Sequence, residues 1–260
     1  MAKQKENAKV ISQEQIADGI FSMWIRTDAA ASAVPGQFIS MYTQDGSKLL
    51  PRPISICEID REQGRLRVVY RVTGKNTGTE QFSRLVAGDE IPLVGPLGNG
   101  FPLEPAKGKR VFLIGGGIGV PPILELAKQI SCERKQIIVG YRDAQTFLRA
   151  EFEQNGETFL STEDGSIGTK GNVLDAIREN ALDADVIYAC GPTPMLRAIK
   201  QYAEEKDIVC YLSLEERMAC GIGACLGCVC QSTEVDAHSH VHNKRVCKDG
   251  PVFLSTEVEI

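Results

Sequence analysis

Three cysteines lie close together near the C-terminal end of this 260-residue chain, at Cys220, Cys225 and Cys228, and a fourth follows at Cys247. This C-x4-C-x2-C spacing with a distant fourth cysteine is typical of a 2Fe–2S cluster, in which each iron takes two thiolates. The glycines and alanine within residues 221–227 let the backbone wrap closely and point N–H groups at the sulfurs. We predict that these four cysteines bind a 2Fe–2S cluster, so the chain must fold its last quarter around them.

Structural zinc and disulfides are two other uses of clustered cysteines. Structural zinc sites usually combine two short C-x2-C steps, and only one such step is present here. Disulfides require an oxidising compartment, yet the chain has an odd number of cysteines, nine, and five of them lie from Cys220 to Cys247. Both alternatives are therefore less favoured than the cluster.

The composition is that of an ordinary globular protein of about two domains, with 43% hydrophobic and 24% charged residues. A net charge of −5 and the lack of a basic run argue against a nucleic-acid partner. The polar N-terminus has no signal-peptide pattern, and no apolar run reaches membrane-spanning length. We expect a cytoplasmic protein that does not bind a membrane.

The first hundred residues predict a small antiparallel β-barrel or sandwich. Short apolar segments alternate with glycine- and proline-containing turns such as Pro35-Gly36 and Gly88-Asp89. The predicted strands cover residues 21–25, 37–43, 54–59, 66–72 and 90–94.

Within this region, several residues suit a dinucleotide. Arginine can grip a pyrophosphate with its planar guanidinium, proline sets the direction of the following strand, and a serine hydroxyl can reach a ring nitrogen. Tyr70 offers an aromatic face, and Gly78-Thr79 can present donors to a phosphate. Taken singly, each has an ordinary structural explanation. The candidate set is Arg52, Pro53, Ile54, Ser55, Val69, Tyr70, Arg71, Gly78 and Thr79.

From about residue 109, strands and helices alternate, which predicts a doubly wound parallel sheet. An apolar strand at 110–114 runs into a glycine-rich turn, and a helix at 123–130 follows two prolines. Such a turn lets backbone amides approach a phosphate, although it departs from the G-x-G-x-x-G spacing. The candidate nucleotide-binding residues here are Gly115, Gly116, Gly117 and Gly119.

A second turn of this kind, Cys190-Gly191-Pro192, follows a strand at 185–190. We expect Cys190 at the edge of the sheet beside a nicotinamide; the alternative is a small buried side chain. The remaining predicted strands and helices complete the alternation. They are strands at 136–141, 158–161 and 207–212, and helices at 145–154, 172–180 and 194–205.

Together, the Arg52–Ser55 segment, the glycine turn at 115–119 and Cys190-Gly191-Pro192 resemble the ferredoxin–NADP reductase superfamily over nearly the whole chain. The segments at 212–228 and 246–253 are similar, more narrowly, to the electron-transfer subunit of NAD-dependent (class 1B) bacterial dihydroorotate dehydrogenase. This resemblance implies an FAD-binding β-barrel (1–104), an NAD-binding α/β domain (105–212) and a small 2Fe–2S domain (213–260).

The resemblance also implies one FAD and one cluster per subunit, NAD as electron acceptor, and a role in pyrimidine (UMP) biosynthesis. The partner would be an FMN-containing catalytic subunit, in a heterotetramer with two copies of each chain. Electrons would pass from that FMN through the cluster and FAD to NAD. No residue stands out as a general acid or base for dihydroorotate, so its oxidation is assigned to the partner.

Two alternative functions stay open. One is an electron-transfer subunit of another NAD(P)H-dependent flavoenzyme, such as a ferredoxin or sulfide oxidoreductase. Tyr141-Arg142-Asp143 does not decide between NAD and NADP, because it offers one charge of each sign. The other alternative is a zinc-stabilised binding module without enzymatic activity.

The polar loop at 231–244 contains all three histidines of the chain, His238, His240 and His242. We expect them to be solvated, because four cysteines already complete the ligand set. Cys230 should point away from the cluster, two residues after Cys228. Cys57, Cys132 and Cys210 lie in apolar segments and should serve packing.

Overall fold

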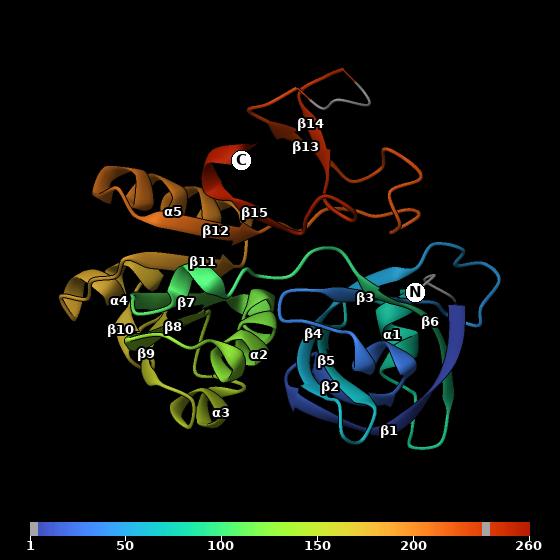
Figure 1. The fold of residues 1–260 in the computed structure, drawn as a ribbon. Helices are drawn as coiled ribbons and strands as arrows, with labels where there is room; N and C mark the ends of the chain where they lie inside the picture. Colours follow the sequence, from blue (N-terminus) through green and yellow to red (C-terminus); the bar gives the residue numbers. More distant parts are fainter. Residues whose placement is uncertain (1–4, 236–239) are drawn as a thin grey trace.

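The computed structural model describes residues 5–235 and 240–260. It has a closed antiparallel barrel, a mostly parallel sheet covered by helices, and a C-terminal segment that lies against both (Figure 1). The predicted fold class is therefore confirmed. None of the helices in the described part of the chain is long and apolar enough to span a membrane.

The barrel has six strands in the order β1-β2-β5-β4-β3-β6. Alternate residues of these strands, such as Met23 and Ile25, are fully buried inside it, as the period of two predicts. A short helix, α1, covers one opening, and Phe82 of that helix is buried in the barrel core. The elements are β1 (Lys5–Ala17), β2 (Ile20–Arg26), β3 (Phe38–Met41), β4 (Arg52–Asp60), β5 (Arg65–Arg71), α1 (Gly78–Phe82) and β6 (Glu90–Leu97).

The first strand, β1, is not among the strands predicted from the sequence. β1 begins at Lys5 and pairs with both β2 and β6, so it closes the barrel. Its first half is mixed polar and apolar, which hides it from a periodicity search.

The second unit is a seven-stranded sheet in the order β10-β9-β8-β7-β11-β12-β15. All neighbouring pairs are parallel except β12 and β15. The chain order reverses between β7 and β11, and in such sheets ligands bind where the order reverses. The strands are β7 (Arg110–Gly116), β8 (Arg134–Tyr141), β9 (Glu157–Thr162), β10 (Thr169–Lys170), β11 (Val186–Cys190) and β12 (Val209–Ser213).

Four helices belong to this unit, and they are α2 (Pro121–Gln129), α3 (Arg149–Glu153), α4 (Val173–Glu179) and α5 (Thr193–Lys206). The helix expected at 145–154 is half as long as predicted. Asp143 accepts a hydrogen bond from the backbone N–H of Gln145 at 2.9 Å, which forms a turn, and Leu148 then has a left-handed backbone with φ of 64°. Helical geometry can therefore begin only at Arg149.

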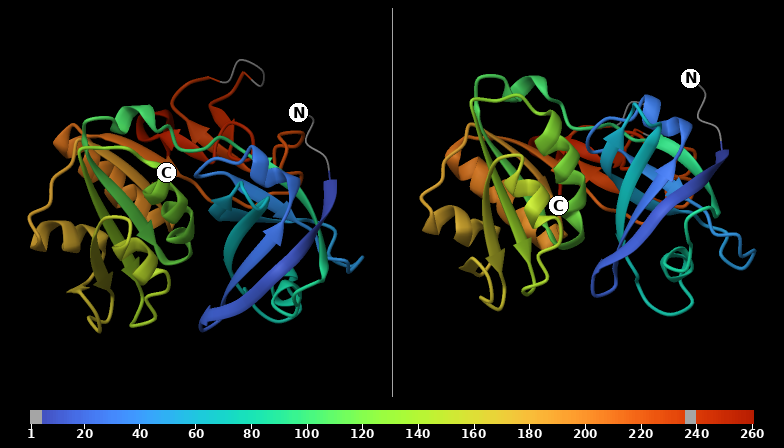
Figure 2. Two further views of the ribbon diagram at one scale, coloured as in Figure 1. Left: turned by 60° about the horizontal axis from the view of Figure 1, so that its bottom comes forward. Right: turned by 90° about the horizontal axis from the view of Figure 1, so that it is seen from below.

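The C-terminal segment bridges the two larger units (Figure 2). It contains a three-stranded sheet of β14 (Asn243–Arg245), β13 (Val229–Ser232) and β16 (Val258–Glu259), and it also supplies β15 (Val252–Leu254) to the large sheet. That contribution was not predicted. The boundaries after residues 104 and 212 stay predictions. Four 3-10 helices complete the elements, η1 (Asp28–Ala31), η2 (Glu104–Ala106), η3 (Gly117–Gly119) and η4 (Ser255–Glu257).

Candidate functional site

The four predicted ligand cysteines meet as two pairs of thiols. Sγ of Cys225 lies 3.3 Å from Sγ of Cys220, and the backbone N–H of Cys247 points at Sγ of Cys228 over 3.4 Å. A backbone N–H from Gly223 reaches Sγ of Cys247 at 3.1 Å, which joins the two pairs. Two thiolates for each of two irons is the donor set that a 2Fe–2S cluster requires.

Backbone amides around Cys220 favour its thiolate form. Burial opposes ionisation, but N–H groups of Ile222, Cys225 and Ala224 outweigh it and lower the pKa of Cys220 to about 6. Burial and the neighbouring Cys228 instead raise the pKa of Cys247 to about 12. The loop therefore directs more backbone N–H donors at the sulfurs of the Cys220–Cys225 pair than at those of the Cys228–Cys247 pair.

Among the described residues, no three histidine, cysteine, aspartate or glutamate side chains converge on one metal position. Two separate thiol pairs suit two irons better than the tetrahedral geometry of structural zinc. Cys230 lies apart from the pairs, since its Sγ faces the carbonyl of Lys244 at 3.6 Å. His240 and His242 are exposed, whereas His238 lies outside the described residues.

The candidate FAD residues lie on β4, β5 and the start of α1. Gly78 is packed against Arg52, because a Cβ on Gly78 would lie 2.8 Å from Nε of the arginine. Arg52 and Gly78 are thus brought together at the end of the barrel, where a larger side chain would displace the guanidinium. Pro53, Ile54 and Ser55 follow along β4 and are partly buried.

Two members of this set differ from expectation. The ring of Tyr70 is only 1% exposed and lies inside the barrel between Phe21 and Phe82, so it offers no aromatic face to a ligand. On a strand the neighbouring residues point the other way, and Val69 is accordingly buried in the core shared with the sheet. The hydroxyl of Thr79 is bonded to Thr73 at 3.1 Å and is buried, so it is not free to meet a phosphate.

The two glycine turns of the sheet interlock at the reversal point between β7 and β11. A Cβ on Gly119 would lie 2.5 Å from the carbonyl oxygen of Cys190, and one on Gly116 would lie 2.3 Å from Sδ of Met195. Glycine at both positions therefore allows the two turns to pack directly against each other. This brings the predicted residues Gly115–Gly119 and Gly191-Pro192 to one edge of the sheet.

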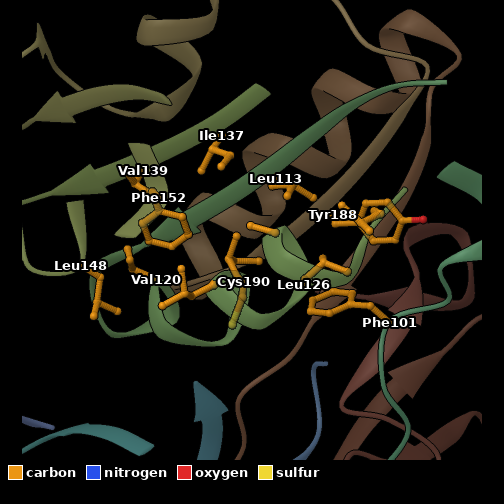
Figure 3. Packing of buried hydrophobic residues seen from close by; sticks show 14 of the residues in the cluster. Phe101, Leu113, Val120, Leu126, Ile137, Val139, Leu148, Phe152, Tyr188 and Cys190 are labelled. Atoms are coloured by element: carbon orange, nitrogen blue, oxygen red, sulfur yellow. The ribbon is translucent and has the colours of Figure 1, made fainter. Parts of the chain in front are cut away.

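Cys190 is the last residue of β11, as predicted, but its thiol is buried. It is 1% exposed and packs in the core near Val120 and Leu126 (Figure 3). Burial raises the pKa of this thiol well above its usual range. In the structure Cys190 thus packs like the buried side chain of the alternative explanation, and Pro192, not Cys190, lines the adjoining cavity.

A cavity of about 770 Å³ lies at the carboxyl ends of β7, β8 and β9. Both halves of the molecule line it, because Arg71 of the barrel borders it together with Gly116 and Gly117 of the sheet, and Nη2 of Arg71 would lie 3.8 Å from a Cβ on Gly117. The hydroxyl of Ser161 is buried without a partner at its wall, which suits a polar ligand. Its position agrees with nucleotide binding at the carboxyl ends of parallel strands.

One charged group in this region was missed by sequence reasoning. Glu215 lies two residues after the end of β12, and its side chain reaches solvent between neighbouring protein groups. Burial raises the pKa of Glu215 while the guanidinium of Arg71 lowers it, so the two side chains lie near each other. The signal in the sequence that could have indicated Glu215 as a site residue is its position just past the carboxyl end of a predicted strand.

Two family models match the chain. Residues 215–259 match the iron-sulfur cluster binding domain of dihydroorotate dehydrogenase B, and residues 113–201 match the oxidoreductase NAD-binding domain. The first match spans all four predicted ligand cysteines, and the second spans both glycine turns.

The chain is similar over its full length to curated relatives named "Dihydroorotate dehydrogenase B (NAD(+)), electron transfer subunit". One from Geobacillus sp. (strain WCH70) is 45% identical, with 99% of each chain covered. Another, from Geobacillus thermodenitrificans, is 43% identical with 98% of each chain covered.

Among solved structures, an NADH-dependent reduced ferredoxin-NADP oxidoreductase superposes with a TM-score of 0.85 at 28% identity, covering 98% of this chain and 90% of that one. A ferredoxin NADP+ reductase from Neisseria gonorrhoeae gives a TM-score of 0.66 at 15% identity, covering 77% of this chain and 91% of that one. The second likeness concerns the fold alone.

Proposed function

This chain belongs to the family of electron transfer subunits of dihydroorotate dehydrogenase B (NAD(+)), and we propose that it carries electrons from a catalytic partner to NAD+ in pyrimidine (UMP) biosynthesis. The observation that carries the proposal is the arrangement of four cysteines as two pairs beside the barrel. The same chain has a nucleotide-sized cavity at the carboxyl ends of the strands of its sheet. Electron transfer needs such neighbouring sites, and the chain is an oxidoreductase subunit on this basis.

Cys220 with Cys225 would bind one iron, and Cys228 with Cys247 would bind the other. The N–H groups of residues 222–225 would stabilise the negative charge on the sulfurs. The glycines of this loop, which have no side chain, let those backbone amides come close to the sulfurs.

In the barrel, Arg52 and Gly78 would hold the pyrophosphate of FAD, since the guanidinium lies directly beside the glycine. The ring system would lie along β4, against Pro53, Ile54 and Ser55, with Val69, Tyr70 and Thr79 contributing through their backbone. In the sheet, the glycines of residues 115–119 and Gly191-Pro192 would bind NAD, while Arg71 faces both sites. When bound, FAD exchanges hydride with nicotinamide and single electrons with an iron–sulfur cluster.

The catalytic partner is proposed to carry FMN and to form a heterotetramer with two copies of each chain. We place the protein in the cytoplasm, because the cysteines that bind an iron–sulfur cluster must stay reduced, which a reducing compartment ensures. The divisions at 1–104, 105–212 and 213–260 are part of the same proposal.

The test separates this chain from its partner. The isolated holoprotein should oxidise NADH with an artificial electron acceptor and should leave dihydroorotate untouched until the FMN-bearing subunit is added. The rates of NADH oxidation and of dihydroorotate oxidation are measured separately, each with and without the partner. Dihydroorotate turnover by the isolated chain would contradict the proposal.

Matched cysteine variants sharpen the test. Cys228→Ser should lose the iron–sulfur absorbance and electron exchange with the partner, yet keep NADH oxidation with a dye through FAD. Cys230→Ser, two residues away and bonded elsewhere, should keep all three properties. Equal iron loss in both variants would contradict the assignment of ligands.

A second function deserves a test because of the 28% identical ferredoxin-NADP oxidoreductase structure. In that case the chain would exchange electrons with ferredoxin. Replacing the dihydroorotate dehydrogenase partner by reduced ferredoxin in the NAD+ reduction assay distinguishes the two, and we expect no turnover.

A further inference from the structure

A serine on the barrel has a buried hydroxyl with no partner. Ser40, in β3, is 1% exposed, and its Oγ is one of three buried side-chain polar atoms in the described residues that make no hydrogen bond. The other two have evident settings, because Ser161 lines the nucleotide cavity and Gln136 already bonds through its amide nitrogen. An unpartnered buried hydroxyl destabilises the folded state, so its retention calls for a reason.

The hydroxyl points at the cluster loop. Along β3, Ile39 and Met41 are buried inside the barrel, whereas Phe38 packs in the core that contains Cys228 and Cys247. Strand alternation therefore places Ser40 on the same outer face as Phe38. A Cβ on Gly221 would lie 2.7 Å from Ser40 Oγ, and Gly221 directly follows Cys220.

Ser40 also adjoins the strand proposed to hold FAD. Its register partner on β4 is Pro53. The hydroxyl thus lies between the β4 segment Arg52–Ser55 and the start of the cysteine loop. A serine kept only for its small size has a simple substitute, because alanine would fill the same space without burying an unpaired hydroxyl.

The surroundings of Cys220 indicate what the hydroxyl would meet. The backbone N–H of Cys225 already points at its sulfur over 3.4 Å, and the N–H groups of residues 222 and 224 lie near it. Hydrogen bonds to cluster sulfurs are one of the means by which a protein sets the reduction potential. An O–H donor from the opposite side would extend this pattern.

Resting on the proposed function, we propose that Ser40 donates its hydroxyl hydrogen to a sulfur of the cluster at Cys220 and so raises the cluster's reduction potential. Such a bond stabilises the more negative, reduced cluster. Through Ser40 the barrel, and not only the cysteine loop, would then contribute to the reduction potential of the cluster.

The experiment is a redox titration of the holoprotein followed by electron paramagnetic resonance of the reduced cluster. Ser40→Ala should lower the equilibrium constant of one-electron reduction about tenfold, which is about 59 mV. NADH oxidation with a dye should not change, because it bypasses the cluster. The control is Ser232→Ala. Ser232 is a buried serine of β13, in the C-terminal segment, and its hydroxyl already donates to the backbone carbonyl of Glu234 at 2.6 Å. The reduction potential of the cluster in this variant should match that of the unaltered protein.

An unchanged potential in a fully loaded Ser40→Ala protein would overturn the inference. If that variant fails to bind iron, Ser40→Gly answers the same question, because glycine also removes the hydroxyl and adds neither volume nor a further iron ligand. A lowered potential in it supports the inference, and an unchanged one overturns it. Absence of a cluster from the unaltered protein would instead reject the proposed function.

Discussion

The barrel touches the rest of the chain through two faces of opposite character. The face toward α2 is charged: Arg67 bonds Glu58 at 2.6 Å and Ser22 at 2.8 Å, and Lys128 of α2 also pairs with Glu58. The face toward the cluster loop has no ion pair among its described contacts at Phe38, Ser40 and Gly98 and is built from apolar side chains, bare backbone and the uncharged hydroxyl of Ser40.

The difference follows from what each face must do. Buried charges with fixed partners define one relative arrangement of two units, because any shift leaves a charge unpaired. Glycine contacts let two backbones approach within van der Waals distance, which suits a site that wraps around a cofactor. We therefore expect damage to the first face to reduce stability, and damage to the second to reduce cluster binding.

Breaking the charged face should have the largest effect. Arg67→Ala removes the main partner of Glu58, whose side chain is 11% exposed, and should lower the free energy of unfolding by about 4 kcal/mol. Urea unfolding measures this, with Arg84→Ala as control, because Arg84 pairs with Glu80 at the surface and should cost below about 0.5 kcal/mol. Equal losses in the two variants would remove the distinction between the faces.

Breaking the glycine face should cost somewhat less stability but more iron. Gly98→Ala would place a Cβ 2.5 Å from Pro251 and 2.8 Å from the carbonyl oxygen of Gly250, at a φ of 72°. We expect a loss of about 3 kcal/mol, about 1 from the backbone and about 2 from the clash, together with reduced iron content. Gly19→Ala is the control, since its φ is 66° with open space around it, and only the loss of about 1 kcal/mol should remain. Full iron content in Gly98→Ala would contradict this expectation.

The smallest effect should be a change in pH dependence at the charged face. Burial raises the pKa of Glu125, whose carboxylate accepts the backbone N–H of Ile59 at 2.8 Å. The folded state therefore holds the proton more tightly than the unfolded state, and stability falls as pH rises from the unfolded pKa through the folded one. Glu125→Gln keeps an acceptor and removes the charge. As pH rises, the unaltered protein should lose stability relative to Glu125→Gln, so the unfolding free energy of the variant minus that of the unaltered protein should increase. A difference that does not change with pH would contradict this prediction.

The sequence was informative wherever local spacing determines chemistry. The four cysteines, the glycine turns and the alternation of strands and helices are all read within short windows, and the predicted fold class was confirmed. Side-chain direction was harder to predict. Tyr70 points into the barrel and Cys190 into the core because strand register and packing decide this, and both depend on residues far away in the chain.

Contacts between distant segments were missed for the same reason. The contact of Ser40 with the cysteine loop joins positions about 180 residues apart, and no local pattern in either segment predicts it. The Glu58–Arg67 pair likewise depends on α2, whose Lys128 also pairs with Glu58, and this contact joins positions 70 residues apart.

The pairing of β15 with β12 has a consequence for cluster assembly. The backbone N–H of Leu214 bonds to the carbonyl of Pro251 at 2.9 Å, so the cysteine-bearing stretch leaves and rejoins the large sheet at one place. Both ends of this long loop are thus held by the sheet as well as by the proposed cluster ligands, and the sheet bears part of the entropy of closing the loop. We therefore expect the nucleotide-binding framework to persist when iron is removed.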